Sequence, residues 1–115
     1  ELCIAAIDDD LDNHEIEWTK QHACGVVIAS EGYPENYTKN NEVKIQATDL
    51  DGVKLFHAGT KLDQNKIFTS GGRVFCATAL GNNLREAQQK AYSLVESVAF
   101  NGAFCRKDIG DKGIR

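Results

Sequence analysis

One run of residues constrains the fold more than any other. Residues 23–29, Ala-Cys-Gly-Val-Val-Ile-Ala, are all small or apolar, and three of them are β-branched. A short, continuous apolar run bounded by turn residues is typical of a buried strand. A second run, residues 74–80, has the same character and ends at Gly81. The sequence therefore predicts a sheet with two buried strands, of which 23–29 is the most buried.

A helix is predicted directly after the second buried run. Asn83 is a good N-cap, and Glu86 follows three residues later, at the spacing of a capping box. The apolar residues that follow recur at helical spacing and form one stripe: Leu84, Ala87, Ala91, Leu94, Val95 and Val98. Asn101-Gly102 supplies a stop of the C-cap type. We interpret this segment as a helix that packs against the sheet and carries no chemistry.

Shorter strands are predicted between and before these elements. Residues 43–47 and 53–57 alternate apolar and polar side chains, and residues 66–68 return antiparallel after a glycine interruption. Residues 15–18 alternate in the same way over a shorter stretch. The expected fold class is α+β: a mainly antiparallel β-sheet with one long helix packed on one face.

The charge of the chain limits its partners. At 115 residues with a formal net charge of -4, it is expected to be a single domain without the basic surface of a nucleic-acid-binding protein. No apolar run approaches the length that spans a membrane. Residues 1–36 contain nine acidic residues and one base, Lys20, so the remaining chain carries a net charge of +4.

The cysteine and acidic residues suggest no metal site. Cys3, Cys24, Cys76 and Cys105 lack C-x-x-C spacing, and three of them lie in apolar surroundings. We interpret them as buried, reduced thiols of a cytoplasmic protein. The acidic run at residues 8–12 is expected to face water, and His14, His22 and Cys24 lack the second close pair that a zinc site needs.

Two stretches interrupt the strands with small and polar residues, namely 56–61 and 68–74. Their glycines let the backbone approach a ligand closely, and their hydroxyls can donate hydrogen bonds. An arginine can donate two parallel hydrogen bonds to two oxygens of one phosphate. The residues concerned are Gly59, Thr60, Thr69, Ser70, Gly71, Gly72 and Arg73. We predict a phosphate or carboxylate site here. The alternative is two glycine-containing hairpin turns with a surface arginine.

Three further residues, His57, Tyr33 and Tyr37, lie at the edges of this predicted site. His57 leaves the apolar face of its strand just before Gly59, a position more typical of a hydrogen-bonded structural histidine than of a catalyst. Gly32 and Pro34 break the chain after the first buried run. This turn brings Tyr33 and Tyr37 to a strand end, where ligands are often held.

Five motifs, taken in order, resemble one family. They are Val27-Ile28-Ala29-Ser30-x-Gly32-Tyr33-Pro34, Phe56-His57-Ala58-Gly59-Thr60, Thr69-x-Gly71-Gly72-Arg73-Val74, Thr78-Ala79-Leu80-Gly81 and Arg106-x-Asp108-Ile109-Gly110. With these gaps the chain resembles the C-terminal domain of glycinamide ribonucleotide synthetase, also called phosphoribosylamine-glycine ligase, of the ATP-grasp superfamily. The resemblance runs from about residue 1 to residue 110.

This resemblance implies a ligase of purine biosynthesis. Such an enzyme joins glycine to 5-phosphoribosylamine through a glycyl phosphate, with ATP and magnesium held by domains ahead of this one. Residues 1–10 would be the end of the preceding core helix and residues 11–115 the C-terminal domain. The chain contains no Met, so Glu1 is not expected to be a translation start. The isolated chain is expected to bind neither ATP nor Mg²⁺ and to be inactive.

The resulting hypothesis is that this domain closes one wall of the active site and holds the phosphoribosyl substrate. The expected substrate-binding residues are His57, Gly59, Thr60, Thr69, Ser70, Gly71, Gly72, Arg73 and Arg106. Two alternatives stay open. The chain could be the corresponding domain of another ATP-grasp carboxylate-amine ligase, or a non-catalytic interaction module in which the acidic first third is a docking face.

Overall fold

The computed structural model describes residues 1–114, which form eight strands, three α-helices and one 3-10 helix. The strands are β1 (His22–Ser30), β2 (Glu42–Ile45), β3 (Val53–His57), β4 (Thr60–Asp63), β5 (Lys66–Thr69), β6 (Arg73–Gly81), β7 (Val98–Ala99) and β8 (Ala103–Phe104). The helices are α1 (Leu2–Ile7), α2 (Leu84–Glu96) and α3 (Asp111–Ile114), with the 3-10 helix η1 at Leu11–Asn13.

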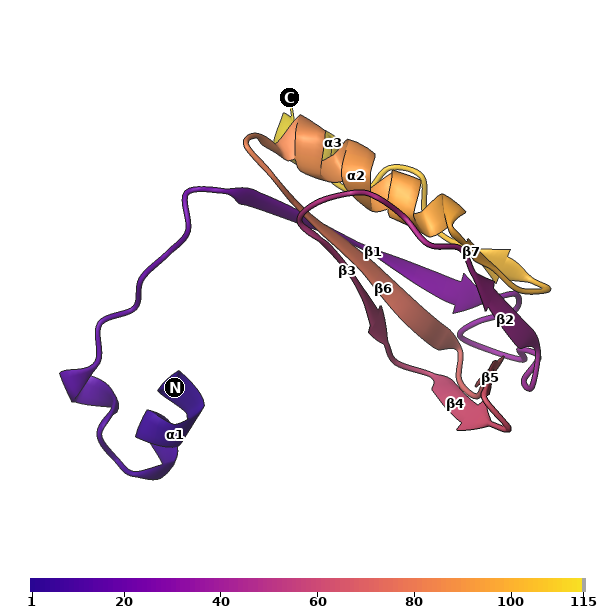
Figure 1. Cartoon of the computed structure of the whole chain (residues 1–115), viewed down its shortest axis with the longest axis horizontal. Helices are drawn as coiled ribbons and strands as arrows, with labels where there is room; N and C mark the ends of the chain where they lie inside the picture. The colour runs from indigo at the N-terminus through magenta and orange to yellow at the C-terminus, as the bar shows by residue number, and fades with distance from the viewer. Residues whose placement is uncertain (115) are drawn as a thin grey trace.

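The strands form two four-stranded antiparallel sheets with α2 as the main helix (Figure 1). Sheet A has the order β3-β6-β1-β8, and sheet B has the order β4-β5-β2-β7. The long strands β1 and β6 pair from His22 opposite Gly81 to Ala29 opposite Arg73. The structure therefore confirms the predicted α+β class and divides the expected sheet into two.

The hydrophobic core lies between sheet A and α2. Val26 of β1 and Ala79 of β6 are fully buried against Ala87 and Ala91 of the helix. Because alanine is small, the helix axis can approach the sheet closely, and the apolar stripe predicted from the sequence is the buried face. A second buried cluster, Ile28, Val43, Val74, Phe75 and Val98, joins sheet A to sheet B.

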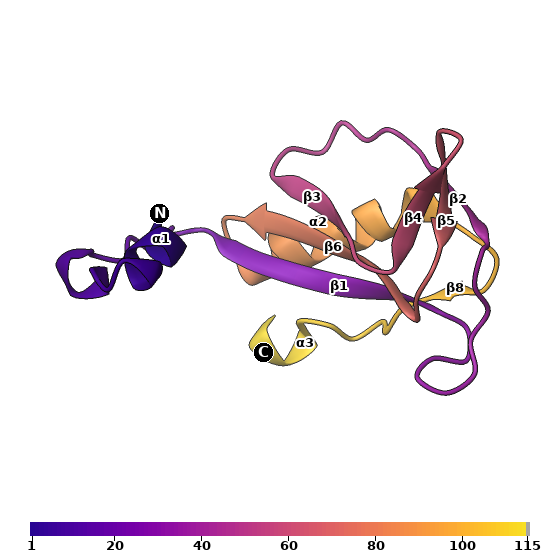
Figure 2. The ribbon, with the colours of Figure 1, turned by 90° about the horizontal axis from the view of Figure 1, so that it is seen from below.

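The opposite face of sheet A is not covered by a helix (Figures 1 and 2). Val27 of β1 is 43% exposed there, although its strand neighbours Val26 and Ile28 are buried, and Phe56 of β3 is 50% exposed. The expectation that residues 23–29 form the most buried strand is therefore wrong in one respect: β1 is buried on one face only. Its exposed face forms part of the pocket described below.

The predicted helix ends earlier than its apolar stripe suggests. The helix stops at Glu96, and the Ser97 hydroxyl donates a hydrogen bond of 2.6 Å to the carbonyl oxygen of Leu94. Val98 then pairs with Ile45 of β2 as part of β7. Its side chain still enters the core, but from a strand, because pairing in sheet B satisfies the backbone there.

Two other local expectations are wrong, and one is confirmed. Residues 15–18 form no strand, and Trp18 is 84% exposed. Residues 66–68 do return antiparallel, as part of β5, which pairs with β4 and β2, whereas β3 pairs with β6. Cys24 is buried and Cys76 and Cys105 are half-buried, but Cys3 is exposed on α1.

Residues 1–21, which we call the N-terminal arm, extend away from both sheets (Figures 1 and 2). The arm contains α1 and η1, which contact each other. Ile7 is 82% exposed, and Ile4, Leu11 and Ile16 are exposed too. Apolar side chains of the arm therefore have little cover within the described residues. None of the helices in residues 1–114 is long and apolar enough to cross a membrane.

Candidate functional site

The two glycine-containing stretches meet where the chain passes between the sheets. Residues 58–59 connect β3 of sheet A to β4 of sheet B, and residues 70–72 connect β5 back to β6. The Gly59 amide donates to the carbonyl of Arg73 at 2.9 Å, and the Ser70 amide donates to the carbonyl of Gly59 at 2.7 Å. The two stretches therefore lie side by side, as the sequence predicted.

Close packing of the backbone explains two of the glycines. A Cβ atom on Gly59 would lie 2.7 Å from the carbonyl oxygen of Arg73 and 2.8 Å from the Cα of Gly71. A Cβ atom on Gly71 would lie 3.1 Å from the Cα of Gly59. The two glycines thus allow the strands to touch at the corner between the sheets. Their presence alone does not indicate a ligand.

A pocket of about 570 Å³ opens beside this corner. It lies on the uncovered face of sheet A and combines an apolar floor with aromatic and cationic walls. The lining residues are Val27, Tyr33, Tyr37, Ala58, Gly59, Gly72, Arg73, Phe75 and Cys76. Three of the predicted site residues, Gly59, Gly72 and Arg73, therefore line one cavity.

Hydrogen-bond donors at the pocket remain available to a ligand. Arg73 is exposed, and within residues 1–114 it makes no ion pair with a carboxylate. Its guanidinium carbon lies 5.9 Å from the centre of the Tyr33 ring. The amide groups of Gly71 and Gly72 also have no hydrogen-bond acceptor among the described residues, but Gly72 is buried and Gly71 does not line the pocket. A guanidinium and backbone amides are groups that can bind a phosphate.

Three of the predicted site residues, Thr69, Thr60 and His57, have partners within the chain. Thr69 is buried, and its Oγ1 accepts a hydrogen bond of 3.0 Å from the Asn41 amide. Thr60 Oγ1 and His57 Nδ1 are hydrogen-bonded at 3.0 Å. The His57 ring packs edge-on against Phe75, with centroids 4.9 Å apart. These side chains stabilise the corner, and the bonding of His57 is that of a structural histidine.

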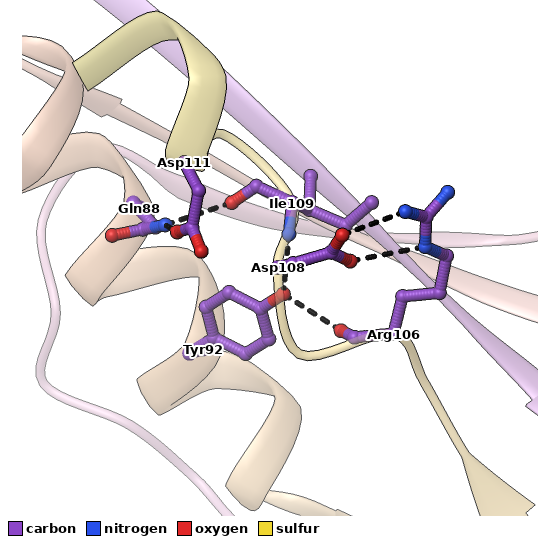
Figure 3. Close-up of polar contacts among 6 residues, drawn as sticks. All are labelled: Gln88, Tyr92, Arg106, Asp108, Ile109 and Asp111. Carbon is purple, nitrogen blue, oxygen red and sulfur yellow. Dashed lines mark hydrogen bonds and ion pairs between the residues drawn. The ribbon is translucent and has the colours of Figure 1, made fainter. Parts of the chain in front are cut away.

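Arg106 does not line the pocket. Its guanidinium donates two hydrogen bonds to Asp108, at 3.0 and 2.7 Å (Figure 3). The bonded guanidinium lowers the pKa of the Asp108 carboxyl, and the carboxylate raises the pKa of Arg106. Arg106 instead borders a separate hollow of about 290 Å³, formed with residues 108–113.

Helix α2 holds the segment around Arg106 in place. The Tyr92 hydroxyl donates to the carbonyl of Arg106 at 2.7 Å and accepts from the Ile109 amide at 3.1 Å (Figure 3). Burial raises the pKa of Tyr92. Gln88 donates to the carbonyl of Ile109 at 2.9 Å and to Asp111 at 2.6 Å. Arg106 is therefore part of a C-terminal segment that is fixed to the helix.

Sequence reasoning did not assign six of the nine pocket residues to the site, although one of them, Ala58, lies within the predicted stretch 56–61. Tyr33 and Tyr37 were placed at a strand end, but nothing in the sequence showed that the Tyr33 ring lies against Arg73 and Gly72. Val27, Phe75 and Cys76 also line the pocket and were interpreted only as strand residues. Alternation along β1 and β6 could have assigned Val27 and Cys76 to the face opposite the helix.

The donor set gives no indication of a metal centre. Among residues 1–114, no three His, Cys, Asp or Glu side chains are grouped so that they could hold a metal ion. A pocket wall that carries an exposed guanidinium can attract an anionic ligand.

Comparison with known proteins identifies similar chains. Residues 23–112 match the family model described as phosphoribosylglycinamide synthetase, C domain. The phosphoribosylamine-glycine ligases of Vibrio cholerae and Escherichia coli K12 are 47% and 44% identical to this chain, over 115 and 116 residues. Each alignment covers 99% of this chain and 27% of the relative, so the chain spans about a quarter of those proteins.

A solved structure has the same fold. The crystal structure of phosphoribosylamine-glycine ligase from Thermotoga maritima aligns with a TM-score of 0.76 and 32% sequence identity. The alignment covers 94% of this chain and 27% of that one. Both the sequence and the fold of these 115 residues therefore correspond to one part of a longer protein.

Proposed function

Because the chain belongs to the phosphoribosylglycinamide synthetase C-domain family, we propose that it is the C-terminal domain of a phosphoribosylamine-glycine ligase. The whole enzyme would join glycine to 5-phosphoribosylamine with ATP in purine biosynthesis. This domain would close one wall of the active site and hold the phosphoribosyl substrate. ATP and Mg²⁺ would be bound by other domains of the same protein, and the 115 residues alone would be inactive.

One observation carries the proposed substrate-binding role. Arg73 lines a pocket of about 570 Å³ without a carboxylate partner among residues 1–114, and the amides of Gly71 and Gly72 are close to it in the chain. We expect these groups to bind the phosphate of 5-phosphoribosylamine. Thr60 and His57 would fix the corner beside it. Arg106 stays a prediction, because a substrate would have to compete with Asp108 for its guanidinium.

The exposed apolar residues of the N-terminal arm support a boundary within the chain. Helix α1 exposes Ile4 and Ile7, and the match to the family model begins only at residue 23. We propose that residues 1–10 complete the preceding ATP-grasp core and that residues 11–115 form the C-terminal domain. In that arrangement the core would cover the apolar side chains of α1.

Substitution of Arg73 in the full-length ligase tests the substrate-binding role. A charge-assisted hydrogen bond contributes roughly 1.5–3 kcal/mol, so Arg73→Ala should raise the KM for 5-phosphoribosylamine by about tenfold to a hundredfold. The KM values for ATP and glycine should change little. Arg85→Ala is the matched control, because it removes the same charge from an exposed position of α2. An unchanged KM for 5-phosphoribosylamine in Arg73→Ala would exclude Arg73 from the site.

A further inference from the structure

The Tyr33 ring lies directly on the backbone of the pocket. A Cβ atom on Gly72 would lie 2.1 Å from Cδ2 of Tyr33 and 2.8 Å from Cε2. No side chain larger than hydrogen fits between the two. Gly72 is therefore a glycine because the Tyr33 ring occupies the space where a side chain would be, and not because of its own backbone angles.

The loop that carries Tyr33 is fixed to the same corner. The Ser30 amide donates to the carbonyl of Gly72 at 2.7 Å, and the Tyr33 amide donates to the carbonyl of Ser30 at 3.1 Å. Gly32 has a φ of 94°, and a Cβ atom there would lie 1.8 Å from the carbonyl oxygen of Asn36. These contacts restrict the loop, so the position of the ring relative to residues 72–73 is defined by the backbone.

The same ring is also a neighbour of the Arg73 guanidinium. The guanidinium carbon is 5.9 Å from the centre of the Tyr33 ring, within the range of a cation-π contact. Tyr37 packs against Tyr33 with ring centroids 6.2 Å apart, and both rings line the pocket. Lys39 lies over the Tyr37 ring at 5.6 Å. Two aromatic rings thus hold two cations at one end of β1.

An aromatic partner differs chemically from a carboxylate. A carboxylate would orient the guanidinium but would neutralise its charge, and an incoming phosphate would have to displace it. A ring attracts the cation through its quadrupole and leaves the net charge and the N–H donors available. The Arg106–Asp108 pair of the same chain shows the other arrangement, in which two guanidinium nitrogens already donate to a carboxylate.

We propose that Tyr33 is a positioning residue for substrate binding: its ring holds the Arg73 guanidinium at the pocket while leaving that charge free for the phosphate. The proposal rests on the proposed function, in which Arg73 binds the phosphate of 5-phosphoribosylamine. Tyr33 itself need not touch the substrate. Its effect should therefore depend on the presence of Arg73.

A double-mutant cycle in the full-length ligase tests this dependence. Tyr33→Leu should raise the KM for 5-phosphoribosylamine by about fivefold, near the upper part of what an exposed cation-π contact supplies. The kcat and the KM for ATP should stay within twofold of the parent enzyme. Tyr33→Phe keeps the ring and should restore the parent KM. In an Arg73→Ala background, Tyr33→Leu should have no further effect on the KM.

The outcomes separate the two proposals. If Arg73→Ala leaves the KM unchanged, the proposed function fails at this site and the positioning role fails with it. If Arg73→Ala raises the KM but Tyr33→Leu changes it less than twofold, only the positioning role is overturned. The same holds if Tyr33→Leu has an equal effect with and without Arg73, because that result would indicate a general structural role. The proposal is supported if Tyr33→Leu raises the KM for 5-phosphoribosylamine while Tyr33→Phe keeps the parent KM. In addition, Tyr33→Leu must have no effect on the KM in the Arg73→Ala background.

Discussion

At the level of single residues, the three glycines at or beside the pocket are required for different physical reasons. Gly59 and Gly71 allow two backbones to meet, whereas Gly72 makes room for an aromatic side chain from a distant part of the sequence. None of the three has a positive φ, so none is needed for a left-handed turn. Glycine-rich stretches that look alike in a sequence can therefore serve backbone packing and side-chain packing within a few residues.

Substitution of Gly72 separates these reasons. Gly72→Ala should destabilise the chain by about 1–3 kcal/mol, the usual cost of overpacking, because the new methyl group meets the Tyr33 ring. Gly25→Ala is the control, since its nearest neighbour would be the Cys76 sulfur at 3.2 Å, and its cost should be smaller. Urea denaturation monitored by circular dichroism measures both. In a Tyr33→Ala background the cost of Gly72→Ala should fall, and an unchanged cost would contradict the contact.

The sequence predicted the polar half of the pocket but not its aromatic half. Gly59, Gly72 and Arg73 were identifiable because small and charged residues interrupting a strand are unusual locally. The contact between Tyr33 and Gly72 spans 39 positions of the chain and depends on the register of β1 against β6, which no local pattern encodes. Thr69 was assigned to the ligand because a hydroxyl looks the same in sequence whether its partner is a phosphate or the Asn41 amide.

At the level of secondary structure, the beginning of α2 is better defined than its end. Asn83 Oδ1 accepts from the Glu86 amide at 2.8 Å, as the capping-box spacing predicted. Glu86 Oε2 in turn accepts from the Asn82 amide at 2.8 Å, one residue earlier than in the usual box. Local side-chain chemistry fixes this end of the helix. The other end depends on the pairing of β7 with β2, so the apolar stripe alone predicted a helix that was too long.

The carboxylate of Glu86 should make stability depend on pH. Its pKa is lowered, mainly by the hydrogen bond from the Asn82 amide and also by Lys90. A carboxyl whose folded pKa is below its unfolded value, about 4.3, stabilises the fold above that pH and loses this contribution as the pH falls through the folded pKa. The destabilisation caused by Glu86→Gln should therefore be largest near neutral pH and should shrink in acid.

Urea denaturation of the parent chain and Glu86→Gln between about pH 7 and about pH 3 measures this difference. Glu96→Gln is the control, because Glu96 lies exposed at the last position of the same helix. It removes a carboxylate without the hydrogen bond from the Asn82 amide, so it should not reproduce the difference seen with Glu86→Gln. A constant difference between the parent and Glu86→Gln at all pH values would contradict the assignment. Asp108 and Glu42 also have lowered pKa values, so the parent chain should still lose stability in acid.

At the level of the whole molecule, the arm and the sheets are separate bodies of structure. Helix α1 contacts η1, and the arm extends away from both sheets (Figure 2). Most of its large apolar residues are exposed. The helical segment expected within residues 1–10 is present as α1, at Leu2–Ile7. The sequence could not show that Trp18 lies outside the core, because the alternation at residues 15–18 is the same for a paired strand and for an exposed connection.

Removal of the arm should leave the fold intact. Deleting residues 1–21 should shift Tm by less than about 4 °C, as expected when exposed groups without core contacts are lost. Trp18 should be readily quenched by acrylamide in the 115-residue chain and protected in the full-length ligase, where we propose that other domains cover the arm. A large fall in Tm after deletion would show that the arm stabilises the sheets. Equal quenching of Trp18 in both proteins would argue against the proposed cover.

The composition of sheet B has a consequence for how the molecule folds. Its four strands come from three segments of the chain, residues 42–45, 60–69 and 98–99, and the last of these follows α2. The β4–β5 pairing is local, whereas β2 receives its second partner, β7, only from a segment that follows the helix. A nascent chain still lacking β7 would therefore leave one edge of β2 unpaired. It would also lack Val98, which belongs to the buried cluster that joins the two sheets.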